Sequence, residues 1–237
     1  MAVIHHVTLK PGKLELLTSW LPGQPWYAGT GQRQPELSKA GGFRLDDPDG
    51  EVGIEFMAVC DGSGDRPVVY HVPLTYRGAP LDGADHALVG TLEHEVLGPR
   101  WVYDAAHDPV FVAQLFALLN GTAEPQAQSL TDTPDPSVTS DFAASAEAAP
   151  GSALVGSAVA DNGPHGTDIA LETATATSGP VRIRVRRVLH PAQDASAPGP
   201  AQIRGHVTAD WLLPDGTKGR GPYAVVPGDA AGAGAAE

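Results

Sequence analysis

Histidine is the first residue type in this sequence that could do chemistry, because nine of them occur in an acidic chain. The closest approach to a zinc-hydrolase motif is His94-Glu95-Val96-Leu97-Gly98, in which Gly98 stands where the second histidine ligand is needed. Zinc binding of this kind requires two imidazoles on one face of a continuous helix, and Pro99 follows at once. We therefore expect no metal site, and each histidine alone is interpreted as a surface or hydrogen-bonded residue.

Arginine supplies a second pattern, in the run VRIRVRR near the end of the chain. The arginines at alternate positions of this run are Arg182, Arg184 and Arg186. On a strand they would share one face at a spacing of about 6.6 Å and could bind an anion or phosphate. Alternatively, they form a solvent-facing row that pairs with Asp168 and Glu172 of a neighbouring strand. We favour this second interpretation and keep the three arginines as candidate ligand-binding residues.

Other chemical motifs are incomplete. The acidic group that begins at Asp46 and ends at Glu51 lacks the spacing and closing glutamate of a calcium loop, so it predicts a solvated turn. Ser63 lies between two glycines, in a segment that joins two expected strands. This pattern is typical of a turn, whereas a nucleophile elbow joins a strand to a helix. The segment from Gly29 to Gln34 lacks the third glycine of a dinucleotide loop. We expect neither a cofactor nor a catalytic residue.

The first half of the chain is expected to contain both helices and strands, and these elements must position the residues named above. A strand is expected at Val3–Leu9 and a helix at Lys13–Leu21, which Pro22 ends. The runs expected to form strands, the first three as an antiparallel meander, are Phe43–Leu45, Val52–Cys60, Val68–Tyr76, Ala87–Leu92 and Trp101–Tyr103. A helix follows, with Asp108 as N-cap, Pro109 at its first position and Asn120-Gly121 as its stop.

The second half of the chain has the pattern of a linker followed by strands, without a predicted helix. Residues 123–152 are rich in Ala, Ser, Thr and Pro, with Leu130, Val138 and Phe142 as the only large apolar side chains, and predict a flexible linker that these three could fasten to a surface. Five strand runs follow, and they are Ala153–Ala160, Asp168–Thr177, Val181–Leu189, Ile203–Leu213 and Gly221–Val226. The sequence thus predicts an α+β fold in four parts: an α+β domain at 1–122, the linker, a β-rich domain or sheet extension at 153–227, and a disordered tail at 228–237.

Composition excludes several classes of protein. The 237 residues carry 28 acidic and 15 basic side chains, a formal net charge of −13, so a nucleic-acid partner is not expected. No apolar run approaches the 18 or so residues of a membrane span. The first residues lack a basic segment followed by an apolar run, so we expect no secretory signal. The single cysteine, Cys60, cannot form an internal disulfide and sits in an apolar run, so we expect a buried thiol and a cytoplasmic location.

A family resemblance takes the analysis further. The stretch LELLTSWLPGQPWYAGTG contains the motif positions Trp20-Leu21-Pro22, Gln24, Trp26-Tyr27 and Gly29. A later segment runs from Trp101 through Tyr103-Asp104-Ala105 to Asp108-Pro109. In order and spacing both resemble the N-terminal cap of bacterial maltokinases, over roughly the first 120 residues. Pro25 and Thr30 depart from it, because that family carries basic residues there.

The resemblance does not extend to the kinase body of those enzymes. Their catalytic loop needs His-Gly-Asp-x-His-x-x-Asn, whereas His165-Gly166 continues as Thr167-Asp168-Ile169. The run at 181–191 resembles the family strand that carries a phosphate-anchoring lysine, but Arg184 occupies that position. The resemblance implies a stand-alone cap near maltose, trehalose or glycogen metabolism, without phosphoryl transfer.

Two functions from different classes follow, and a third stays open. The leading hypothesis is a non-catalytic interaction or regulatory protein that contacts a sugar-active enzyme. The rival is a small-molecule binding protein, with a sugar stacked on aromatic residues. The aromatic candidates for that platform are Trp20, Trp26, Tyr27, Trp101 and Trp211. An enzyme of unfamiliar type is the third class. A deep pocket walled by two of these aromatics would favour the binding protein, and flat apolar patches would favour the interaction protein.

Overall fold

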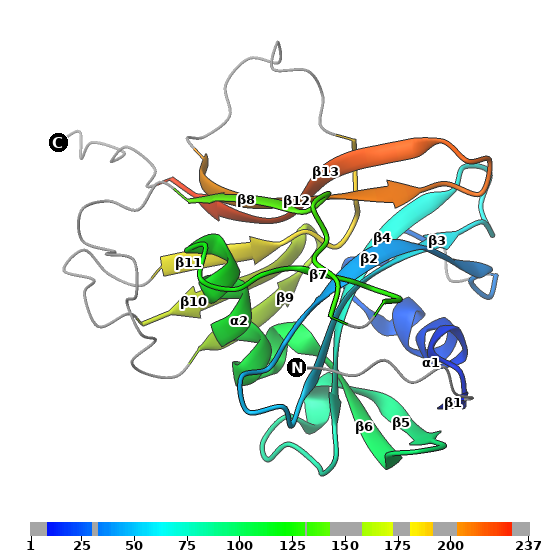
Figure 1. Cartoon of the computed structure of the whole chain (residues 1–237). Helices are drawn as coiled ribbons and strands as arrows, with labels where there is room; N and C mark the ends of the chain where they lie inside the picture. Colours follow the sequence, from blue (N-terminus) through cyan, green and yellow to red (C-terminus); the bar gives the residue numbers. More distant parts are fainter. Residues whose placement is uncertain are drawn as a thin grey trace, which may run out of the picture.

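The structure is a computed structural model that describes residues 9–29, 33–130, 132–142, 158–172, 181–191 and 203–228. Two antiparallel sheets and two α-helices form the framework of this part of the chain (Figure 1). The fold class is therefore α+β, as predicted, with both helices in the first half and strands in the second. The expected strand at Val3–Leu9 and tail at 228–237 lie almost entirely outside the described residues, which begin with a short β1 at Leu9–Lys10.

The first sheet has seven strands. In spatial order they are β1, β5 (Leu88–His94), β6 (Gly98–Asp104), β4 (Val68–Arg77), β3 (Gly53–Asp61), β2 (Leu37–Leu45) and β7 (Gln126–Ala127). The predicted meander β2-β3-β4 is confirmed. The acidic turn between β2 and β3 is held by Asp47, whose carboxylate accepts backbone N–H groups from Asp49, Glu51 and Val52. That carboxylate closes a turn, as the sequence indicates.

Two helices cover opposite faces of the first sheet (Figure 1). α2 (Pro109–Leu119) begins as predicted, with the Asp108 carboxylate accepting the Val110 N–H at 2.9 Å and Gly121 beyond its end at a φ of 70°. α1 (Lys13–Trp20) ends one residue earlier than expected and continues as a 3-10 turn, Leu21–Gly23, around Pro22. Among the described residues no helix is long and apolar enough to cross a bilayer.

The second sheet has six strands. In spatial order they are β8 (Thr139–Phe142), β12 (Ile203–Leu212), β13 (Lys218–Pro227), β11 (Val181–Val185), β10 (Gly166–Leu171) and β9 (Val159–Gly163). The strand expected at Val181–Leu189 is wrong in its extent, because β11 ends at Val185. Beyond it the chain leaves the second sheet and bonds to the first, since Arg187 O accepts from His71 N at 2.9 Å and Leu189 N donates to Val69 O at 2.8 Å.

One apolar core joins the two sheets. On β3, Ile54, Phe56 and Cys60 face α2 and the second sheet, whereas Met57 and Val59 face α1. Because both faces of β3 are covered, its residues 56–60 are all apolar. The second sheet closes the core on its side. Its buried contributors are Ile169, Leu171, Ile183, Val185, Val207, Trp211 and Tyr223.

The region predicted as a linker, 123–152, contains β7 and β8 in its described part. Val138 is buried in the shared core and Phe142 packs against it, whereas Leu130 is 57% exposed. Of the three apolar side chains in this region, two therefore contact the body of the protein. Residues 143–152 lie outside the described part of the chain.

Candidate ligand-binding pocket

A cavity of about 580 Å³ lies where the two sheets meet. This volume is within the range of about 300–1,000 Å³ that small-molecule sites occupy. Five segments line it: Trp26 and Ala28 after the 3-10 turn, the start of β4 from Pro67, the β9–β10 turn at Pro164-His165, the crossing segment Arg186–Pro191, and the β12–β13 hairpin. The pocket is thus assembled from both halves of the chain.

The crossing segment creates the pocket. Arg186 N still donates to Tyr223 O of β13, and the next residues bond to the first part of β4, which β6 leaves uncovered. Because β6 pairs with β4 only at Leu74–Arg77, the segment fills the β4 edge near Val69 and His71. The side chains of Arg186 and Arg187 are thereby carried from the surface of one sheet to the junction of two.

Two tryptophans form walls of the cavity. Trp26 is 2% exposed and packs against Trp20 and Tyr70, with ring centroids 5.8 and 6.0 Å away. Trp211 is 3% exposed and lies over Gly219, where a side chain would collide with the indole. Only a small part of each ring faces the cavity. The indole N–H of Trp26 has no hydrogen-bond partner among the described residues.

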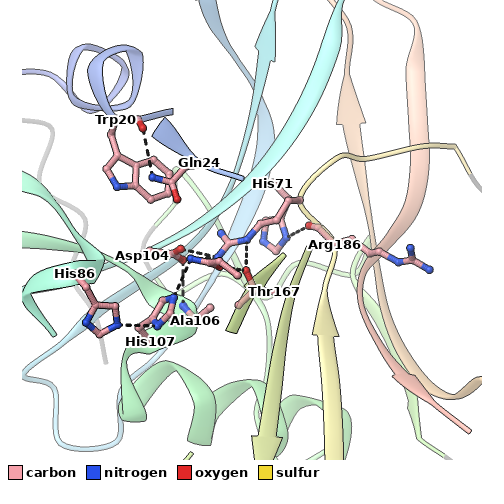
Figure 2. Close-up of polar contacts among 11 residues, drawn as sticks. Trp20, Gln24, His71, His86, Asp104, Ala106, His107, Thr167 and Arg186 are labelled. Atoms are coloured by element: carbon pink, nitrogen blue, oxygen red, sulfur yellow. Dashed lines mark hydrogen bonds and ion pairs between the residues drawn. The ribbon is translucent and has the colours of Figure 1, made fainter. Parts of the chain in front are cut away.

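A buried ionic network lies beside Trp26. Arg187, 1% exposed, donates from Nη2 to both Asp104 oxygens at 2.6 and 2.7 Å and from Nε to Thr167 Oγ1 at 2.8 Å. Its guanidinium carbon lies 4.9 Å from the centre of the Trp26 ring, a cation–π arrangement. Asp104 belongs to the first sheet and Thr167 to the second, so this guanidinium bonds to both sheets. Figure 2 shows the side chains of Asp104 and Thr167 close to one another. Nη1 of Arg187 has no partner in the described part of the chain.

Histidines extend the network in two directions. Thr167 donates to Asn162, whose amide nitrogen lies 3.1 Å from Nε2 of His107, and His107 Nδ1 lies 3.2 Å from Nε2 of the exposed His86 (Figure 2). Burial lowers the pKa of His107. His71, fully buried, contacts the Arg186 carbonyl through Nδ1 at 3.0 Å, and burial together with the Arg187 charge lowers its pKa to about 3.

Arginine, lysine and histidine side chains line the pocket. Lys218, His165 and His190 are exposed and line its mouth, and Arg186 is half-buried. Figure 2 shows the Arg186 side chain directed away from the Asp104 network. Burial, and then the charge of Arg184, lower the pKa of the Arg186 guanidinium, whose Nε has no partner among the residues described. None of the described residues that line the cavity is acidic.

The structure separates the six candidate site residues. Trp26 and Arg186 line the pocket. Tyr27 lies beside it, with its hydroxyl donating to Asp61 at 3.1 Å and its ring 5.7 Å from that of Tyr70. The remaining three candidates do not line the cavity. They are Trp101, which packs in a small cluster with Tyr103, Arg182, which is exposed, and Arg184, which pairs with Asp168.

The Arg184 pair confirms the interpretation of the arginine row as sheet construction at one position. Asp168 stands directly opposite Arg184 in the β10–β11 ladder and accepts from its Nε and Nη2 at 2.6 and 2.8 Å. Arg186 departs from this row because the strand has ended before it.

Sequence reasoning assigned no role to Arg187 or His190, and it named Asp104 only within the cap-like segment and His165 only beside the missing kinase loop. Arg187 breaks the alternation of the run and follows Arg186 directly, which was the one visible signal. The failed zinc motif has a structural role instead, since His94 Nδ1 accepts the N–H groups of Val96 and Leu97 in the β5–β6 turn. Within the described residues no three metal-ligating side chains gather.

A comparison with known protein families finds a match within the first half of the chain. The family model described as the maltokinase N-terminal cap domain matches residues 20–108, from the end of α1 to the N-cap of α2. Over these residues the chain is cap-like, which confirms the resemblance found in the sequence. No curated protein matches the chain. The match includes Trp26 and Asp104, but the crossing segment and the β12–β13 hairpin lie beyond it.

Proposed function

We propose that this protein is a non-catalytic binding protein that holds a small carbohydrate in the pocket between its two sheets. The observation that carries the proposal is the cavity of about 580 Å³ with Trp26 and Trp211 among its walls. Indole rings pack favourably against the apolar faces of sugar rings, while nearby polar groups fix orientation. The cap-like region contributes one of the two tryptophans, and the maltokinase likeness supports a setting in maltose or trehalose metabolism.

The non-catalytic part of the proposal rests on the sequence. The catalytic loop of the maltokinase body has no counterpart, because His165-Gly166 continues as Thr167-Asp168-Ile169 and lacks the aspartate and asparagine at the motif positions that orient the sugar hydroxyl and hold magnesium. The expected result with ATP, magnesium and either maltose or glucosamine is no transfer of labelled phosphate above a buffer blank. Transfer to either sugar would contradict this part. The cytoplasmic location expected from the lone Cys60 likewise stays a prediction.

Ligand binding is tested by closing the mouth of the pocket. Thr217 is exposed and lines the cavity, so Thr217→Trp would obstruct it without disturbing the core. Leu212→Trp is the matched control, because Leu212 lies on the same hairpin, is 49% exposed and does not line the cavity. Calorimetric titration with glucose, maltose, trehalose and their phosphates should give binding to the parent that Thr217→Trp weakens by about ten-fold or more. Equal affinity in both variants would place the ligand elsewhere.

Exposed apolar residues favour a second candidate function, the binding of a protein partner. The tip of the β5–β6 hairpin, inside the cap-like region, exposes Val96 at 57% and Leu97 at 46%. These two side chains favour contact with a protein partner, for which we propose an enzyme acting on maltose or trehalose. Co-elution with such an enzyme, lost in the double variant Val96→Ser/Leu97→Ser, would support it. Co-elution unchanged by the double variant would exclude the hairpin tip.

A further inference from the structure

The charges around the pocket are unlike those of the chain as a whole. The protein carries a formal net charge of −13, yet Arg186, Arg187 and Lys218 line the cavity and, among the described residues, no carboxylate does. The charge of Arg187 is balanced by Asp104 behind it. In the described part of the chain, neither Arg186 nor Lys218 forms an ion pair, and the aspartate nearest in the ladder, Asp168, is engaged by Arg184. The pocket is therefore a local excess of positive charge.

Hydrogen-bond donors without partners also concentrate here. Nη1 of Arg187, Nε of Arg186 and Nε1 of Trp26 belong to pocket-lining residues, and all three are buried without a partner among the described residues. A buried donor left unsatisfied is energetically unfavourable, so such groups are normally paired. Each of these three groups can only donate, and none accepts. Their complement is a group rich in acceptor oxygens.

The Arg187 side chain is built as a fixed floor. Its Nε and Nη2 are held by Thr167 and Asp104, and its face lies over the Trp26 ring, so the direction of Nη1 is set before any ligand arrives. Because this guanidinium is buried, it fixes the wall of the cavity in place rather than offering an exposed donor to a ligand. Arg186 and Lys218 add charge nearer the mouth.

We infer that the pocket binds a phosphorylated sugar, with the phosphate held near the mouth by Arg186 and Lys218 and the sugar in the cavity beside Trp26 and Trp211. This inference rests on the proposed function and narrows its ligand class. The phosphate has three acceptor oxygens and a negative charge, which match the donors and the local excess of cations. A neutral sugar can accept hydrogen bonds through its hydroxyl oxygens, but it carries no charge to balance these cations.

The experiment compares glucose, glucose 6-phosphate, maltose and inorganic phosphate by calorimetric titration on the parent and on variants. Glucose 6-phosphate should bind at least about ten-fold more tightly than glucose and than phosphate alone. Arg186→Gln should remove most of that advantage. Arg184→Gln is the matched control, because Arg184 is two residues away and paired with Asp168 outside the pocket, and it should keep affinity within about two-fold. Lys218→Gln, at an exposed position, gives a second pocket variant should Arg186→Gln fold poorly.

The outcomes separate this inference from the proposed function. Binding of glucose or maltose with no advantage for glucose 6-phosphate would overturn the phosphate inference and leave the carbohydrate proposal standing. Inorganic phosphate as tight as glucose 6-phosphate would keep the anion site and overturn the sugar. No binding by any of the four probes would overturn both. An advantage for glucose 6-phosphate that survives Arg186→Gln and Lys218→Gln would remove these side chains from the site.

Discussion

Two arginine–aspartate pairs that begin three residues apart in the sequence differ in almost everything except their chemistry. Arg184 bonds to Asp168 at 2.6 and 2.8 Å, and Arg187 bonds to Asp104 at 2.6 and 2.7 Å. The first pair lies across neighbouring strands with side chains 39% and 47% exposed. The second joins the two sheets with side chains 0% and 1% exposed. Similar distances therefore conceal very different surroundings.

The difference in burial between the two pairs shows where an ion pair matters for the stability of the fold. In water-exposed surroundings the attraction is screened and opposed by side-chain entropy, so such a pair contributes little. In the interior, each charge has lost its hydration, and either one without the other is strongly unfavourable. The stability of the contact between the two sheets, here called the seam, should therefore be sensitive to substitution of either Arg187 or Asp104. The Arg184–Asp168 pair should contribute little to the stability of the fold. This difference also explains why the buried guanidinium can serve as a fixed part of a binding site.

The largest expected effect is that of removing one buried charge. Asp104→Asn leaves the Arg187 guanidinium buried without its carboxylate and should lower the free energy of unfolding by about 3–5 kcal/mol. Urea denaturation followed by circular dichroism measures the loss. A loss below about 1 kcal/mol would mean that the seam tolerates an unbalanced charge, contrary to the comparison.

The control replaces both partners together. Asp104→Leu/Arg187→Met removes the charges and fills the space with apolar side chains, and it should regain most of the stability lost in Asp104→Asn. A double variant as unstable as Asp104→Asn would show that packing, rather than the uncompensated charge, causes the loss.

Much of this seam was beyond prediction from sequence, and the reasons are physical. The α2 helix and the β2-β3-β4 meander were predictable because Asp108, Pro109 and the turn residues act on their immediate neighbours. The Arg187–Asp104 pair joins residues 83 apart, and only the packing of two sheets brings them together. Trp26 and Arg186 could each be named as a candidate binding residue from its side-chain type. That both line one cavity could not be predicted, because it depends on the chain leaving β11 after Val185.

An intermediate effect comes from His71, which shares the buried surroundings of Arg187. Its pKa is about 3 in the folded protein, against about 6.5 when unfolded, through burial and the Arg187 charge. Below pH 6.5 the unfolded state therefore binds more protons, and stability is lost as the pH falls toward 3. Between pH 7 and pH 5 this amounts to about 2 kcal/mol.

The measurement is the free energy of unfolding at pH 7, 6 and 5 in the parent and in His71→Gln. Burial also lowers the pKa of His107, so part of the slope stays in the variant. Lys13 and other partners lower the pKa of Glu55 against its burial, so its contribution is lost only at pH values below this window. Identical slopes in parent and variant would show that His71 does not titrate as its surroundings require.

The smallest expected effect belongs to the exposed pair. Arg184→Gln should change the free energy of unfolding by less than about 1 kcal/mol, because both side chains remain in water and solvent screens their attraction. A double-mutant cycle with Asp168→Asn isolates the pairwise coupling, which should lie near about 0.2–1 kcal/mol and shrink as salt is added. A coupling above about 2 kcal/mol, insensitive to salt, would place the β10–β11 pair in the same class as the buried one. Burial would then not be the variable that distinguishes the two pairs, and the sensitivity of the seam to Asp104→Asn would need another cause.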